Sequence, residues 1–140
     1  MKYYAVIDTN VIISGMLKKE SIPGGILEFI YVGIITPLLN DEIVTEYTAV
    51  AKRNKFGFDE EHINDTIKAI TEHALFLDRQ ATIEEFVDKK DIVFYEIVLS
   101  ARTKMDAYLV TGNIKHFPIK SFVVTPKEMI DIISQGNDES

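Results

Sequence analysis

The sequence predicts an α/β protein: a three-layer α/β/α sandwich with a central parallel sheet. Short apolar runs rich in β-branched and aromatic residues alternate along the chain with longer segments of helical spacing. Strands that are separated by helices pair in parallel, and such sheets are covered on both faces. The 140 residues are 46% hydrophobic and contain no long linker or repeat. We therefore expect one domain over 1–134 and a flexible polar tail over 135–140.

The first half of the chain contains two predicted strands and four predicted helices. An apolar run over 3–7 is a buried strand that ends at Asp8, and a short helix over 11–17 follows the polar residues after it. Pro23 begins a second helix, which Gly33 stops. The remaining elements of this half are a strand over 34–38, a helix from 41 to about 53 capped by Asn40 or Asp41, a basic turn over 52–58 and a helix over 59–72.

The second half contains three short predicted strands and two predicted helices. The strands cover 75–77, 108–111 and 121–124, and Thr125 caps a final helix that has Pro126 at its first position. Asp91 stands before a helix over 92–103, whose apolar stripe at 94, 97, 98 and 101 predicts its buried face. The same spacing places Glu96 on the opposite face, in solvent.

Composition excludes several classes of protein. The absence of cysteine excludes disulfides, thiolate metal sites and thiol catalysis, and it favours a reducing compartment. With 15 basic and 22 acidic residues the net charge is −7, so a nucleic acid must be held by local basic patches or by metal ions. The apolar window over 24–39 is interrupted by Glu28, Gly33 and Pro37, and no export signal is visible. We expect a cytoplasmic protein without membrane association.

Polar side chains are predicted to meet at one edge of the sheet. Asp8 directly follows the first strand and Asn113 follows the strand over 108–111, which places both at the carboxyl ends, where ligands of such sheets bind. Glu46 borders the apolar stripe of its helix, and Asp91 stands at the N-terminal end of a packed helix. Oxygen ligands without His or Cys select Mg²⁺ or Mn²⁺, which typically support phosphoryl chemistry.

Each of these residues also has a structural explanation. Asp8 and Asp91 are well placed to cap the helices that follow them. Glu46 alone is more often a surface charge, and Asn113 alone is a common turn residue after glycine. The interpretation as a metal site requires that these side chains lie together.

Four ordered segments resemble the PIN-domain nucleases over about residues 3–125. They are Val6-Ile7-Asp8-Thr9-Asn10-Val11-Ile12, Glu46-Tyr47, Asp91-x-x-Phe94-Tyr95-Glu96 and Leu109-Val110-Thr111-Gly112-Asn113. The most similar subgroup is the bacterial and archaeal set described as toxins of toxin–antitoxin systems. The resemblance implies an endoribonuclease that uses Mg²⁺ or Mn²⁺ to cut single-stranded or structured RNA, forms homodimers and binds a small antitoxin protein.

The resemblance also implies roles for individual residues. Asp8, Glu46 and Asp91 would be the catalytic, metal-binding acids, and the supporting polar residues would be Thr9, Asn10, Thr111 and Asn113. Asn113 stands where the family usually has a fourth acid, which leaves open whether one metal or two would bind. An alternative is a catalytically weakened PIN-like module that binds RNA or protein.

Two basic segments are candidates for binding RNA. Lys52, Arg53 and Lys55 are interleaved with Phe56 and Phe58, which combines charge with stackable rings. The alternative is a solvated helix end whose basic residues complement the helix dipole. Lys115 and His116 follow Asn113 directly and should lie near the site, although His116 could instead fix its loop.

Two further acids lie near the predicted site in sequence. Asp88, three residues before Asp91, could face the site. Asp106 precedes its strand, so we expect it near the opposite edge of the sheet.

Overall fold

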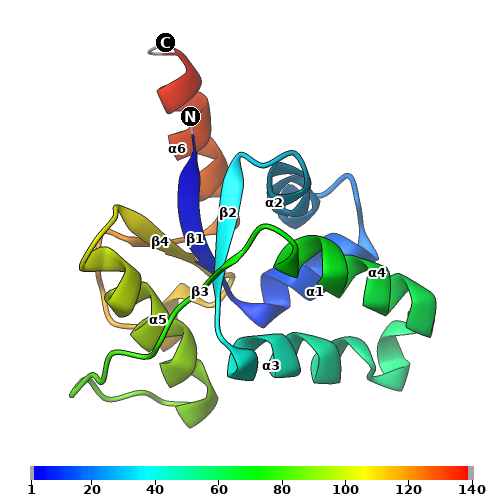
Figure 1. Ribbon diagram of the computed structural model, residues 1–140, viewed down its shortest axis with the longest axis horizontal. Helices are drawn as coiled ribbons and strands as arrows, with labels where there is room; N and C mark the ends of the chain where they lie inside the picture. Colours follow the sequence, from blue (N-terminus) through cyan, green and yellow to red (C-terminus); the bar gives the residue numbers. More distant parts are fainter. Residues whose placement is uncertain (1, 139–140) are drawn as a thin grey trace.

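The computed structural model describes residues 2–138 and contains one five-stranded sheet (Figure 1). Every pair of neighbouring strands is parallel, and the order across the sheet is β3-β2-β1-β4-β5. The predicted α/β class with a parallel central sheet is therefore confirmed. The strands are β1 (Tyr3–Ile7), β2 (Ile35–Leu39), β3 (Leu75–Phe76), β4 (Ala107–Val110) and β5 (Val123–Val124).

Six α-helices connect and cover the strands. They are α1 (Thr9–Leu17), α2 (Ile22–Tyr31), α3 (Asp41–Ala51), α4 (Glu60–Thr71), α5 (Ile92–Arg102) and α6 (Pro126–Asp138), with 3₁₀ turns η1 (Asn54–Phe56), η2 (Lys89–Asp91) and η3 (Ile114–His116). Asn40 caps α3 by accepting a hydrogen bond from the Ile43 N–H at 2.9 Å. At the start of α6, Thr125 and Glu128 form a reciprocal capping box, at 2.9 and 3.1 Å.

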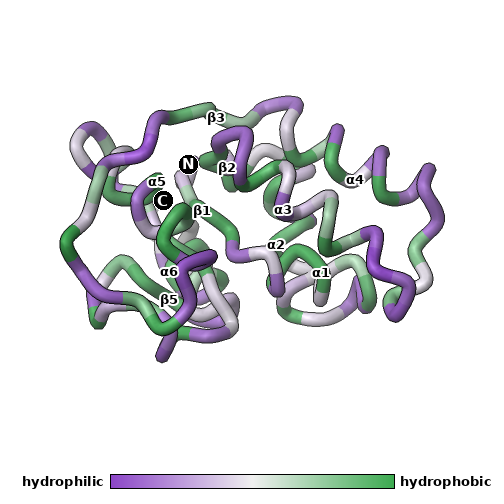
Figure 2. The backbone as a smooth tube through the Cα atoms, turned by 90° about the horizontal axis from the view of Figure 1, so that it is seen from below, coloured by the Kyte–Doolittle hydropathy of each residue, from purple (hydrophilic) through white to green (hydrophobic). Residues whose placement is uncertain are grey.

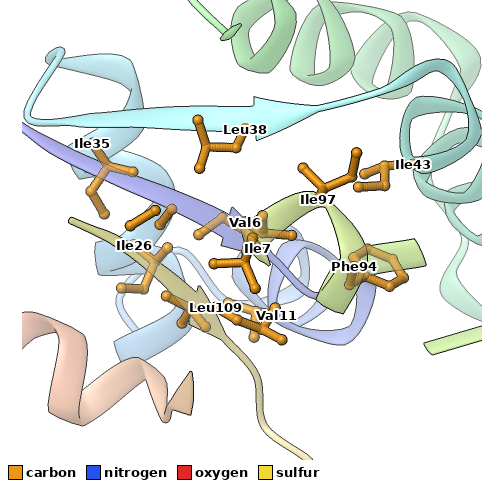
Figure 3. Close-up of a cluster of buried hydrophobic side chains, with 14 of the residues drawn as sticks. Val6, Ile7, Val11, Ile26, Ile35, Leu38, Ile43, Phe94, Ile97 and Leu109 are labelled. Atoms are coloured by element: carbon orange, nitrogen blue, oxygen red, sulfur yellow. The ribbon is translucent and has the colours of Figure 1, made fainter. Parts of the chain in front are cut away.

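The main core lies on the central strand. Val6 and Ile7 of β1 are fully buried, and Figure 3 shows Ile26 of α2 and Ile97 of α5 approaching this strand. Helix α5 contacts β1, β2 and β4, whereas α2 contacts β2 and α6. Helices α1, α3 and α4 lie beyond one side of the sheet (Figure 1) and enclose a smaller core. Along α4, hydrophilic and hydrophobic positions alternate (Figure 2), as expected for a helix with one buried face.

The direction of strand addition reverses between β1 and β4. From β1 the chain adds β2 and then β3 on one side, and it later returns to add β4 and β5 on the other side. Asp8 and Thr111, which follow β1 and β4, therefore stand together at the switch point. In open α/β sheets this crevice is the usual place for a ligand.

The prediction that Glu96 is solvated was wrong. Glu96 is buried, accepts a 2.7 Å hydrogen bond from Nε of Arg79 and also accepts one from the Thr82 N–H at 2.9 Å. The long segment between β3 and η2 wraps over the outward face of α5, so this helix is buried on both faces. Periodicity indicated the sheet-facing stripe correctly but carried no information on what covers the other side.

The helix at the C-terminus is longer than expected. Helix α6 runs to Asp138 and so includes the first part of the tail that we expected over 135–140. Residues 139–140 of that expected tail lie outside the described residues. Within residues 2–138, no helix has the length and apolarity that crossing a membrane requires.

Candidate active site

Asp8 is held at the switch point by both central strands. Its N–H donates to the Val110 carbonyl at 2.9 Å, and its Oδ2 accepts a 2.7 Å hydrogen bond from the Thr111 hydroxyl. Asp8 is 6% exposed. It occupies the N-cap position of α1, but its side chain makes no capping hydrogen bond. The capping explanation therefore does not account for this carboxylate.

Glu46 reaches the same edge from α3. The Thr9 hydroxyl donates to Oε2 of Glu46 at 3.2 Å. The next residue, Tyr47, is buried and donates its hydroxyl proton to the Ile7 carbonyl, which ties α3 to the last residue of β1. Glu46 itself is partly buried. It is therefore not a freely solvated surface charge, which was the structural explanation for this residue.

Asp91 lies at the end of η2, directly before α5. Its side chain makes no capping hydrogen bond, so the structural explanation again falls short. Its Oδ2 atom is buried and accepts no hydrogen bond from any described residue. Nδ1 of the His116 imidazole lies 3.4 Å from this oxygen. A buried carboxylate oxygen without a donor is costly unless a cation or other ligand satisfies it.

The acidic side chains are close enough to influence one another. Burial raises the pKa of Asp8 to about 6; the charges of Asp91 and Glu46 add to the rise, whereas the Thr111 hydrogen bond opposes it. Burial also raises the pKa of Asp91, with Asp88 and Glu46 raising it further and His116 lowering it. These are the shifts expected of partly buried carboxylates that lie near one another.

A groove of about 450 Å³ opens between α1, α3 and the segment before α5. Its acidic part contains Asp8, Glu46 and also Asp88, which the sequence singled out only by its proximity to Asp91. Asp88 also accepts a hydrogen bond from the Lys90 N–H at 2.9 Å and so begins η2. The other residues lining the groove are Thr9, Asn10, Ile13, Ser14, Leu17, Val50, Arg53, Phe56 and Lys90.

The supporting residues lie around these acids in different ways. Oδ1 of Asn10 accepts a hydrogen bond from the Gly112 N–H at 3.5 Å. The Asn113 N–H donates to the Thr111 hydroxyl oxygen at 2.9 Å, so Thr111 links the loop after β4 to Asp8. The Asn113 residue is exposed. Asp106 precedes β4, at the end of that strand opposite to Thr111, as expected.

The candidate RNA contacts are divided between the groove and open surface. Arg53 lines the groove, and His116 lies against Asp91. Lys52, Lys55 and Lys115 are exposed. The basic turn over 52–58 consists of the end of α3, the η1 turn and the approach to α4.

The donor set has the chemistry of a site for a hard divalent ion. All of the candidate ligands offer oxygen, and the unsatisfied Oδ2 of Asp91 is a natural ligand atom. The chemistry of these side chains therefore fits a divalent metal. Within the described part of the chain, however, no three acidic or histidine side chains lie close enough together to coordinate one ion.

Fold and site together define an α/β protein with crowded carboxylates at the switch point of a parallel sheet. The family model of the PIN domain matches residues 4–115, and the chain belongs to the PIN-domain family. PIN domains are generally metal-dependent nucleases, so this is a nuclease-type fold. Searches of curated proteins and of solved structures gave no significant match.

Proposed function

We propose that this protein is an endoribonuclease that depends on Mg²⁺ or Mn²⁺, with Asp8, Glu46 and Asp91 as its catalytic acids. The observation that carries the proposal is that Asp8 and Glu46 line one groove, and that the charge of Asp91, whose Oδ2 is buried and accepts no hydrogen bond from a described residue, reaches Asp8. Crowded, partly buried acids destabilise a fold unless a bound cation neutralises them. Membership of the PIN-domain family supports the same interpretation.

The proposed mechanism assigns a role to each residue of the candidate site. Asp8, Glu46 and Asp91 would hold the cation and be held ionised by it. The bound ion would supply an activated water and stabilise the leaving oxygen of the phosphodiester. The hydroxyls of Thr111 and Thr9 fix the orientation of Asp8 and Glu46 through their hydrogen bonds. His116, whose Nδ1 lies 3.4 Å from Asp91, would contact a phosphate of the bound strand.

The physiological role that we propose is the toxin of a toxin–antitoxin pair, acting in the cytoplasm as a homodimer. Support comes from the motif resemblance and from the net charge of −7, which suits a basic protein partner. Expression of the protein alone should then arrest growth, and co-expression of its small antitoxin should restore it. Growth unaffected by an active nuclease would contradict the toxin role while leaving the activity intact.

The activity is tested by cleavage of a labelled single-stranded RNA with Mg²⁺, with Mn²⁺ and with a chelator. Wild-type protein should cleave only with metal, and Asp8→Asn and Asp91→Asn should each abolish cleavage. Asp106→Asn is the matched control, because Asp106 is exposed at the other end of β4 and pairs with Arg102 at 3.3 Å. Metal-dependent RNA binding without cleavage would instead favour the weakened binding module.

A further inference from the structure

The groove that contains Asp8, Glu46 and Asp88 also has an apolar part. Ile13 and Leu17 of α1, Val50 of α3 and Phe56 of η1 line it, and we call these four residues the apolar wall. Leu17 is 53% exposed, Val50 and Phe56 are partly buried, and Ile13 is buried behind them. The hydrolysis of a phosphodiester bond needs no apolar surface, so the wall is not explained by the chemistry of the acids.

Phe56 is held in place by its surroundings. Gly57 ends η1 with a φ of 68°, a left-handed conformation that glycine adopts without strain. The turn brings Phe58 back onto Phe56, with ring centroids 5.9 Å apart and nearly parallel planes. Phe56 also packs against the small core formed by Ile13, Ala51 and Ile63. A ring fixed in this way loses little conformational entropy when a ligand packs on it.

Cationic side chains accompany the apolar wall. Arg53 and Lys90 line the same groove, and among the described residues neither forms an ion pair. Nζ of Lys55 lies 5.1 Å from the centre of the Phe56 ring. The groove therefore offers acids, an aromatic and aliphatic wall, and guanidinium and ammonium groups.

We propose that the apolar wall is a subsite for one unpaired nucleobase of the bound strand, with Arg53 and Lys90 contacting its flanking phosphates. This inference rests on the proposed nuclease function and names the form of its substrate. A nucleotide combines an apolar ring with an anionic backbone, and the groove combines the matching surfaces. Its volume of about 450 Å³ lies within the range of roughly 300–1,000 Å³ of small-ligand sites.

The subsite would take a base only where the strand is unpaired. A paired base is stacked between its neighbours and is not available to the wall, whereas a base in a loop or single strand can turn into it. The acids repel the phosphate backbone on their own, so base packing supplies part of the attraction that the net charge of −7 does not.

The test measures binding of a fluorescent 12-nucleotide single-stranded RNA of mixed sequence. Asp8→Asn serves as the background, so that the probe is not cut. Phe56→Ala should weaken binding about tenfold or more, and Phe56→Tyr, which keeps the ring, should restore it. Leu17→Ser, at an exposed position, should weaken binding several-fold without disturbing the fold. Phe76→Ala is the control, because Phe76 is 52% exposed on β3 and does not line the groove.

A second probe separates base packing from general weakening. In a series of the same RNA, each strand carries a single abasic residue at a different position. At one position the missing base should weaken binding by itself, and for that RNA Phe56→Ala should cause no further loss of affinity. If the intact strand binds tightly and neither Phe56→Ala nor Leu17→Ser changes its affinity, the subsite is overturned and the nuclease proposal stands. Absence of both RNA binding and metal-dependent cleavage by the wild-type protein would overturn both.

Discussion

The hydroxyl of Thr111 donates a 2.7 Å hydrogen bond to Oδ2 of Asp8, across 103 positions of sequence. This bond joins the ends of β4 and β1 at the switch point of the sheet. It also opposes the rise in the pKa of Asp8 that burial and the neighbouring acids produce. Thr111 is fully buried, so its hydroxyl has no water to bind instead. We conclude that Thr111 orients Asp8 and favours its ionised form.

Replacement of this hydroxyl should affect the charge of Asp8. Thr111→Val keeps the shape of the side chain but removes the donor, so the pKa of Asp8 should rise further above about 6. Cleavage at neutral pH should fall by about tenfold, and stability by about 1 kcal/mol. A carboxyl-detected NMR titration measures the pKa. Thr111→Ser keeps the donor and should behave like the wild type; equal effects of both variants would point to packing alone.

Removal of the Asp8 charge should stabilise the metal-free protein in a pH-dependent way. The pKa of Asp8 is raised in the folded state, to about 6 from 3.8, so its ionisation above pH 6 costs stability, on the order of 2–3 kcal/mol. Asp8→Asn should therefore be more stable than the wild type at pH 8, and the gain should shrink as the pH falls through 6 towards 4. Urea unfolding in the presence of a chelator measures both proteins. A loss of stability at pH 8 would show that Asp8 has a structural role.

The fourth position of the candidate site can be tested by restoring an acid. Asn113 follows Thr111 and Gly112 at the end of β4, where the family usually has an acid. Asn113→Asp should tighten Mn²⁺ binding, because a carboxylate is a stronger ligand than a neutral amide. Calorimetric titration with Mn²⁺ gives the affinity. An unchanged affinity would place residue 113 outside the reach of the metal.

The segment that wraps over α5 should depend on Glu96. Glu96→Ala leaves Arg79 and the Thr82 N–H without their buried acceptor, and we expect a loss of about 2 kcal/mol. Glu42→Ala removes the other ion-pair partner of Arg79, at 2.9 Å. Because Glu42 is exposed, this change should have little effect on stability. Thermal unfolding compares the two variants. Similar small losses in both variants would show that the contacts of Glu96 do not hold this segment.

Sequence patterns were sufficient for the sheet and for the position of Asp8. An apolar run that ends in a polar residue predicts both a buried strand and a side chain at its carboxyl edge, and β1 has the predicted bounds. Sequence patterns could not predict the environment of Glu96, because that environment depends on how the irregular segment between β3 and η2 packs against α5. Local sequence patterns do not distinguish a helix cap from a candidate catalytic acid. The structure shows that the side chains of Asp8 and Asp91 make no capping hydrogen bond, which a sequence pattern does not reveal.

The groove illustrates the same limit. Phe56 and Arg53 were noted in the sequence as a basic, aromatic turn, yet nothing local indicated that this turn borders the acids. Leu17 gave no signal at all, because an apolar residue at a helix end is usually part of a core. The arrangement arises from the packing of α1 against α3, which places Leu17 and Arg53 along the same groove as Asp8.

The most direct test of the account is anomalous diffraction from crystals of the protein grown with MnCl₂. We predict a strong manganese peak at bonding distance from carboxylate oxygens of Asp8 and Asp91, with Glu46 beside it. Crystals of Asp8→Asn should show no peak at this position. This result would show that the crowded acids close around a cation. Wild-type crystals with no manganese at this edge, or with manganese bound only at other acids, would contradict the assignment of these residues as the metal site.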